Sequence, residues 1–183
     1  LPLAVGLAKY FNVVGYDIDV SRIKELKEHR DRTGEVTSKD LASTRINFTN
    51  SSSNLSGTDV FIIAVPTPVD AKKKPDLGAL KSACVDVGKY INVGSVVVFE
   101  STVYPGATEE FCGPILEDIS GSACGKDFFL GYSPERMNPG DPEHTLSNLV
   151  KVVSGQTPEV EELLTKVYGK ITNIFVAKNI ITA

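Results

Sequence analysis

Short runs of consecutive apolar residues alternate along this chain with longer segments in which apolar residues recur every three or four positions. The clearest run, 59–65, shows no alternation of polar and apolar positions, which is typical of a strand buried on both faces of a parallel sheet. The run stops at Pro66, because proline cannot pair within a sheet. The same reasoning predicts further strands at 12–17, 46–49, 95–100, 128–132, 150–154 and 174–177.

Helical spacing fills the segments between these strands. After Asp76, apolar residues recur from Leu77 to Ile91 on one helical face, which makes Cys84 a core residue. Other helices are expected at 21–29, from Ala107 onward with a break near Pro114, and at 157–168. The alternation predicts an α/β fold that is Rossmann-like and doubly wound, with a mainly parallel sheet and helices on both faces.

The chain opens with an apolar, helix-like segment, 1–11, that no strand precedes. A short strand follows and ends in the carboxylate of Asp17. Helix, strand and acidic strand tip form the second half of a dinucleotide-binding βαβ unit, whose first half is a strand and a glycine-rich turn. We therefore expect this first half to lie upstream of Leu1, and residues 1–183 to be one NAD-binding domain that is truncated at its N-terminus.

Asp17 is the first residue with a specific expected role. A carboxylate at the tip of this strand accepts hydrogen bonds from the adenosine ribose and repels a 2′-phosphate, so it favours NAD over NADP. The alternative is an acidic residue that only serves the following helix, although Asp19 and Ser21 suit that purpose. Arg22 is a second cofactor candidate, facing the adenine or ribose, and the alternative for it is a solvated helix arginine.

Three strand ends carry hydroxyls or charges that we expect to meet along one edge of the sheet. They are Val65-Pro66-Thr67, Glu100-Ser101-Thr102 and Ser133-Pro134-Glu135-Arg136. Ligands of open α/β sheets bind beyond the carboxyl ends of the strands. Val65, Pro66, Thr67, Ser101 and Thr102 are accordingly predicted to line the cofactor site.

The loop 131–141 is the densest of these segments. It combines Glu135, Arg136, Asn138 and Asp141 with prolines and glycines that stiffen the backbone. A proline-rich surface turn with solvated charges is the alternative interpretation.

Composition narrows the classes of function. The chain has 183 residues, 42% hydrophobic and 23% charged, with a net charge of −4, so no basic footprint predicts a nucleic acid or an anionic membrane as partner. No apolar run approaches the length of a membrane span, and no signal peptide is recognisable. Three widely spaced cysteines favour reduced thiols in the cytoplasm. Neither histidine has a partner at metal-binding spacing, so no metal site is predicted.

Taken together, these motifs resemble the NAD-binding domain of the UDP-sugar 6-dehydrogenases, which include the UDP-glucose and UDP-N-acetylhexosamine dehydrogenases. The matching motifs are LPLA at 1–4, GYD at 15–17, VPTP at 65–68, ESTVYPG at 100–106 and YSPERMNPGD at 132–141. The last motif is most similar to the branch that acts on UDP-N-acetylglucosamine or UDP-N-acetylgalactosamine.

The resemblance implies that NAD oxidises the C6 hydroxymethyl group of a UDP-sugar to the acid, with two NAD reduced per turnover, for surface polysaccharide precursors. A cysteine of such enzymes holds the aldehyde as a thiohemiacetal, which becomes a thioester and is hydrolysed. By this resemblance Glu135 activates or orients the water and Thr102 helps to hold it beside the nicotinamide. Glu135, Arg136 and Asn138 are implied substrate-binding residues, and the full-length protein is expected to be a homodimer or higher homo-oligomer.

The family's cysteine, central helix and UDP-sugar domain are expected beyond Ala183, so we expect this fragment alone to be inactive. Two other classes remain open. One is an NAD-dependent hydroxyacid-type dehydrogenase that oxidises in a single step without a cysteine. The other is a non-catalytic nucleotide-binding module.

Overall fold

A computed structural model describes residues 1–69, 74–135 and 150–183 of the chain. Its strands are β1 (Val14–Tyr16), β2 (Asn47–Thr49), β3 (Val60–Ile63), β4 (Val96–Phe99), β5 (Phe129–Tyr132), β6 (Val150–Gly155) and β7 (Asn173–Val176). Its α-helices are α1 (Pro2–Leu7), α2 (Val20–Lys27), α3 (Ser38–Ser43), α4 (Gly78–Gly88), α5 (Gly113–Ser120) and α6 (Pro158–Tyr168). Each strand predicted from the apolar pattern is confirmed, with ends within two residues of the prediction.

Three short helical elements are not α-helices. They are the 3-10 turns η1 (Ser52–Leu55) and η3 (Ile180–Thr182) and the π-helix η2 (Ala107–Cys112). η2 leads directly into α5, where Pro114 occupies the first turn. Proline has no N–H group with which to continue a preceding helix, but it is tolerated in the first turn of a new one. The break predicted near Pro114 therefore falls at the junction of η2 and α5.

The sheet is mainly parallel, as predicted, with one exception. Strands β3, β4 and β5 pair in parallel, and so do β6 and β7. β5 and β6 pair antiparallel, with Gly131 opposite Gly155 and Tyr132 opposite Ser154. The N-terminal end of β6 therefore lies at the same sheet edge as the C-terminal ends of β3, β4 and β5.

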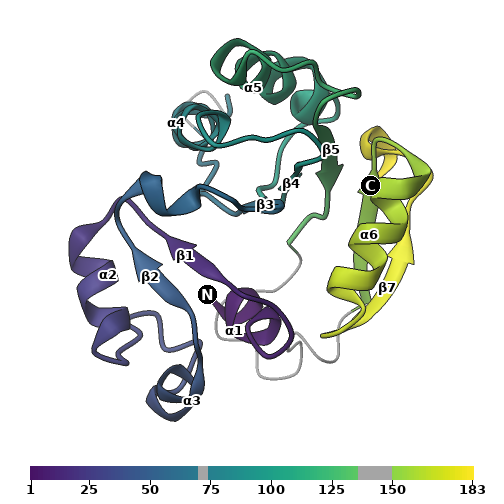
Figure 1. Cartoon of the computed structure of the whole chain (residues 1–183). Coiled ribbons are helices and arrows are strands. Elements are labelled where there is room, and N and C mark those ends of the chain that lie inside the picture. Colours follow the sequence, from purple (N-terminus) through teal and green to yellow (C-terminus); the bar gives the residue numbers. More distant parts are fainter. Residues whose placement is uncertain (70–73, 136–149) are drawn as a thin grey trace.

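Helices cover both faces of this five-stranded sheet (Figure 1). All four residues of β4 are buried, and they alternate between two cores as the period of a strand requires. Val97 and Phe99 lie in the core shared with α4 and α5, whereas Val96 and Val98 lie in the core shared with α6. The uninterrupted apolar run in the sequence follows from this two-sided burial.

Among the described residues, β1 and β2 form a separate, two-stranded parallel sheet. Phe48 of β2 packs with Ile23 and Leu26 of α2 and Leu41 of α3 in a third, smaller core. Asp19 caps α2 by accepting from the backbone of Ser21. The strand that we expect upstream of Leu1 stays a prediction.

Candidate functional site

The ends of β3, β4 and β5 lie side by side, as the sequence predicted. Backbone hydrogen bonds continue beyond the strands: Glu100 N donates to Ile63 O over 2.8 Å, and Ser133 N donates to Phe99 O over 2.9 Å. Glu135 N then donates to Glu100 O over 3.2 Å. The three loops thus leave the sheet from one edge, and the peptide of Glu135 is fixed to the end of β4.

Two side-chain hydrogen bonds tie the first two loops together. Ser101 Oγ donates to Val65 O over 2.7 Å, and Thr67 Oγ1 donates to Thr102 O over 2.6 Å. Ser101 is buried, whereas Thr102 and Pro66 are exposed. The hydroxyl of Ser101 therefore stabilises the loop pair, and the exposed residues form the surface that a ligand would meet.

Behind these loops lies a group of four side chains that we call the charge cluster: Glu100, Glu135, Lys151 and Tyr168. Lys151 Nζ lies 3.3 Å from Glu100 Oε1 and 3.5 Å from Glu135 Oε2. Tyr168 donates its hydroxyl to the same Glu100 oxygen over 2.6 Å. The side chains of Glu100 and Lys151 are 2% and 5% exposed, whereas that of Glu135 is 33% exposed. The cluster thus connects the protein interior to the strand-end surface.

Burial shifts the pKa values of two members of the cluster, Glu100 and Tyr168. It raises the pKa of Glu100, while the Lys151 ammonium and the Tyr168 hydroxyl oppose that rise. Burial also raises the pKa of Tyr168 well above its ordinary value, and the Glu100 carboxylate adds to the increase. Tyr168 therefore remains a neutral hydrogen-bond donor.

Glu100 was expected at this strand end without a specific role, whereas Lys151 and Tyr168 were not predicted from the sequence as members of the site. The antiparallel pairing of β5 and β6 brings Lys151 to this sheet edge, whereas parallel pairing would place it at the opposite edge. A weak signal was present, since Lys151 is a charged residue in the otherwise apolar run 150–153. Charged residues are rarely buried without a partner, so this pattern itself indicates a buried ion pair.

Asp17 follows β1 directly and is exposed. Its backbone N donates to Thr49 O over 3.1 Å, and its Oδ1 accepts from Asp19 N over 2.9 Å. The neighbouring Tyr16 donates its hydroxyl to Asp86 of α4 over 2.8 Å, and burial, together with this bond, raises the pKa of Tyr16 to about 12. The position of Asp17 is compatible with its predicted role as a ribose ligand.

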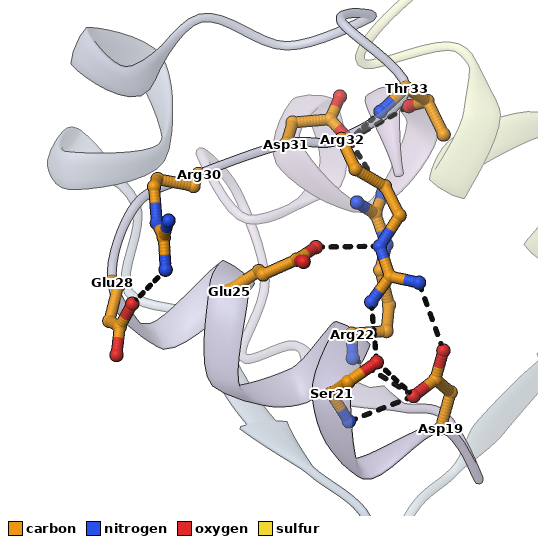
Figure 2. A network of polar contacts seen from close by, with 9 residues as sticks. All are labelled: Asp19, Ser21, Arg22, Glu25, Glu28, Arg30, Asp31, Arg32 and Thr33. Atoms are coloured by element: carbon orange, nitrogen blue, oxygen red, sulfur yellow. Dashed lines mark hydrogen bonds and ion pairs between the residues drawn. The ribbon is translucent and has the colours of Figure 1, made fainter.

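Arg22 has a structural partner that the sequence did not predict. Its Nη2 lies 2.6 Å from Asp31 Oδ1, with the two side chains 12% and 0% exposed (Figure 2). Asp31 also accepts hydrogen bonds from the backbone of Thr33, Glu35 and Val36. The Arg22 side chain is therefore not solvated, and its predicted contact with the cofactor stays a prediction.

Two of the three predicted substrate-binding residues, Arg136 and Asn138, lie outside the residues that the structure describes. A pocket of about 690 Å³ is lined by residues of α1 and α3 and by Arg45 and Lys170, and it contains none of the predicted site residues. Within the described ranges, no group of three or more His, Cys, Asp or Glu side chains is arranged to hold a metal ion. None of the described helices is long and apolar enough to cross a membrane.

This chain is similar in sequence and in fold to known dehydrogenases. The sequence model of one protein family, described as the UDP-glucose/GDP-mannose dehydrogenase family, NAD binding domain, matches residues 1–172. Among solved structures, the UDP-D-ManNAc dehydrogenase from Pyrococcus horikoshii superposes with a TM-score of 0.88 at 30% identity, covering 99% of this chain and 45% of that chain.

Two curated relatives are more similar in sequence. Protein CapL from Staphylococcus aureus is 54% identical over 178 residues, which are 97% of this chain and 42% of that protein. The UDP-N-acetyl-D-glucosamine 6-dehydrogenase from Pseudomonas aeruginosa is 49% identical over 172 residues, 93% of this chain and 41% of that protein. The chain spans about two fifths of the length of these relatives.

Proposed function

Since this chain belongs to the UDP-glucose/GDP-mannose dehydrogenase family as its NAD-binding domain, we propose that the full-length protein oxidises the C6 hydroxymethyl group of a UDP-sugar to the uronic acid. The sugar proposed is UDP-N-acetylglucosamine or UDP-N-acetylgalactosamine, for the synthesis of surface polysaccharide precursors. The relative named UDP-N-acetyl-D-glucosamine 6-dehydrogenase, 49% identical, supports this choice. The observation that carries the proposal is the convergence of the Thr67, Thr102 and Glu135 loops at one sheet edge.

The proposed binding of NAD uses the exposed polar groups at the strand ends. Asp17 accepts hydrogen bonds from the ribose hydroxyls, and its negative charge repels the 2′-phosphate of NADP. Val65, Pro66, Thr67 and Thr102 form the surface against which the nicotinamide end lies, and the buried Ser101 supports it from beneath. Two hydrogen bonds between these loops keep that surface rigid. When bound, NAD supplies the acceptor for the hydride that leaves the C6 carbon.

Glu135 and Thr102 are the residues that we propose to act on the water that the reaction consumes. The overall reaction consumes two NAD⁺ and one water per alcohol, and it yields the carboxylic acid, two NADH and two protons. In our proposal Glu135 holds and orients that water and Thr102 helps to bind it. Glu135, Arg136 and Asn138 are the proposed contacts to the sugar end of the substrate.

None of the three cysteines in this chain suits the covalent step. Cys84 and Cys112 are fully buried, and Cys124 is partly buried. A contact with Cys112, together with burial, raises the pKa of Cys84, and burial raises the pKa of Cys124. A nucleophilic cysteine needs an accessible thiolate. We therefore propose that the nucleophile belongs to the remaining part of the full-length protein, and that residues 1–183 alone do not complete the reaction.

The proposal also covers the compartment and the oligomeric state of the full-length protein. Free, unpaired cysteines support a reducing compartment, for which we propose the cytoplasm. A homodimer or higher homo-oligomer is the proposed assembly.

NADH formation by the full-length protein across a panel of UDP-sugars tests the proposal. The fastest rates are expected with UDP-N-acetylglucosamine or UDP-N-acetylgalactosamine. Absence of NADH with every UDP-sugar would contradict it. A faster reaction with a simple 2- or 3-hydroxyacid would instead support the single-step dehydrogenase.

A further inference from the structure

Lys151 is an unusual residue for its position. Its side chain is 5% exposed in β6, between Val150 and Val152, and its ammonium is surrounded by groups of the charge cluster. Burying an ammonium costs several kcal/mol before its partners compensate, and apolar residues of similar size often stabilise a fold at least as well. Stability alone therefore gives no reason for a lysine here.

Two buried members of the cluster, Glu100 and Tyr168, contact this ammonium. Glu100 Oε1 lies 3.3 Å from Lys151 Nζ and also accepts the Tyr168 hydroxyl over 2.6 Å. The ring of Tyr168 faces the ammonium, with 5.6 Å between Nζ and the ring centroid. These contacts leave the long lysine side chain little rotational freedom.

The pairing of β5 with β6 fixes the position of Lys151 relative to Glu135. Ser133 Oγ donates to Val152 O over 2.8 Å, and Ser154 Oγ donates to Tyr132 O over 3.2 Å. These bonds join the end of β5 to β6. They set Lys151 opposite Glu135, whose Oε2 lies 3.5 Å from Nζ.

We propose that Lys151 is a positioning residue: anchored by Glu100 and Tyr168, it fixes the orientation of the Glu135 carboxylate at the strand-end site. The inference rests on the proposed function for what Glu135 does, whereas the contact itself is independent of that function. The Glu135 side chain is 33% exposed, and its contact with the anchored Lys151 restricts the rotamers that it can adopt. A displacement of a reacting group by about 1 Å costs on the order of 100-fold in rate, so an ammonium that holds this carboxylate still has a direct effect on turnover.

The experiment compares variants of the full-length enzyme. Lys151→Met removes the charge and keeps the length of the side chain, while Lys151→Arg keeps the charge. Glu100→Gln combined with Lys151→Met removes both buried charges, so that variant remains foldable even where Lys151→Met alone, which leaves Glu100 uncompensated, is not.

The expected result is a split between kcat and KM. The double variant melts near the wild-type temperature but loses about 10- to 100-fold in kcat, with the KM values for NAD and UDP-sugar nearly unchanged. Lys151→Arg recovers most of the loss. Wild-type kcat in the double variant would overturn the inference, because a merely structural lysine would have been replaced without consequence.

A second comparison shows whether Lys151 acts through Glu135. In a Glu135→Gln background, the double replacement of Glu100 and Lys151 should cost no further kcat, because the carboxylate it positions is already gone. A full additional loss there would overturn the inference.

If the wild-type protein oxidises no UDP-sugar, the proposed function fails, and kinetics can no longer test the inference about Lys151. The inference is then decided by crystal structures of the wild type and the Glu100→Gln/Lys151→Met variant. A Glu135 carboxylate that moves or becomes disordered in the variant supports it, and one that keeps its position overturns it.

Discussion

The charge cluster and the ionic network around α2 differ in how the chain assembles them. In the α2 network, Arg32 contacts Asp19 at 3.1 Å and Glu25 at 2.6 Å, and Arg30 pairs with Glu28, so its members come from one short segment (Figure 2). The charge cluster joins the ends of β4 and β5 to β6 and α6. The first therefore depends on local sequence, whereas the second exists only after the whole sheet has formed.

Burial separates the two groups further. The Arg32 and Asp19 side chains are 42% and 45% exposed, and solvent screens such pairs. Glu100, Lys151 and Tyr168 are almost fully buried. Within the α2 network only the pair of Arg22 and Asp31 is similarly shielded. The α2 network therefore orders one local loop, whereas the charge cluster ties four elements of the fold together at the strand-end site.

The largest effect is expected at the point where the charge cluster reaches the surface. Glu135→Gln keeps the shape of the side chain but removes its basicity, so kcat of the full-length enzyme should fall by about 100-fold or more. The melting temperature should hardly change, because the side chain is one third exposed. Turnover at the wild-type rate would remove Glu135 from the proposed mechanism.

Asp31→Asn should give the largest loss of stability in the α2 network. Asp31 Oδ1 pairs with Arg22, and Oδ2 accepts from the backbone of Glu35 and Val36. An amide in this place lacks the charge that Arg22 needs, and its NH₂ group must face either the Arg22 guanidinium or the backbone donors. Denaturant unfolding should show a loss of about 3 kcal/mol, without a change in kcat at temperatures where the variant stays folded.

The same variant has a predicted pH dependence. Burial alone would raise the pKa of Asp31, but hydrogen bonds from Thr33 and Arg22 outweigh it and hold the pKa below its usual range. A lowered carboxyl pKa stabilises the fold above the unfolded pKa, and this contribution is lost as the pH falls toward the folded pKa. The difference between wild type and Asp31→Asn should shrink below about pH 3.9. A difference that grows with acidity would contradict this assignment.

Tyr168→Phe should have a smaller effect. It removes the hydroxyl that donates to Glu100 and keeps the ring that faces Lys151. Loss of one hydrogen bond to a buried carboxylate should cost about 1–2 kcal/mol in urea unfolding, and kcat should fall only slightly because Lys151 still contacts both carboxylates. A loss of kcat as large as that of Glu135→Gln would mean that Tyr168 itself acts on substrate.

Arg32→Gln should give the smallest effect. Its contacts to Asp19, Glu25 and Ser21 are exposed, so salt should mask most of the change in melting temperature. A shift as large as that of Asp31→Asn, persisting in high salt, would break the distinction between the two regions.

The apolar pattern was sufficient to predict the strands, because strands buried on both faces leave uninterrupted apolar runs. It was not sufficient to predict the direction of β6, since an apolar run reads the same in either direction. For this reason the position of Lys151 at the site could not be predicted, because Lys151 reaches the site only in an antiparallel strand. The ion pair of Arg22 was not predictable for another reason: its partner Asp31 lies nine residues further along the chain, beyond the spacings at which helix residues meet.

The site itself was predictable where it depends on strand ends. The loops at Thr67, Thr102 and Glu135 follow buried runs, and parallel strands bring such ends together. Glu100 and Tyr168 were not predictable in the same way, because their contact joins residues far apart in the chain and depends on how α6 packs on the sheet.

The stoichiometry of the full-length enzyme tests the central claim most directly. With limiting UDP-N-acetylglucosamine or UDP-N-acetylgalactosamine and excess NAD, two NADH should form for each sugar consumed, with the uronic acid as the product. One NADH per sugar with an aldehyde or ketone as the product, or no NADH at all, would contradict the account.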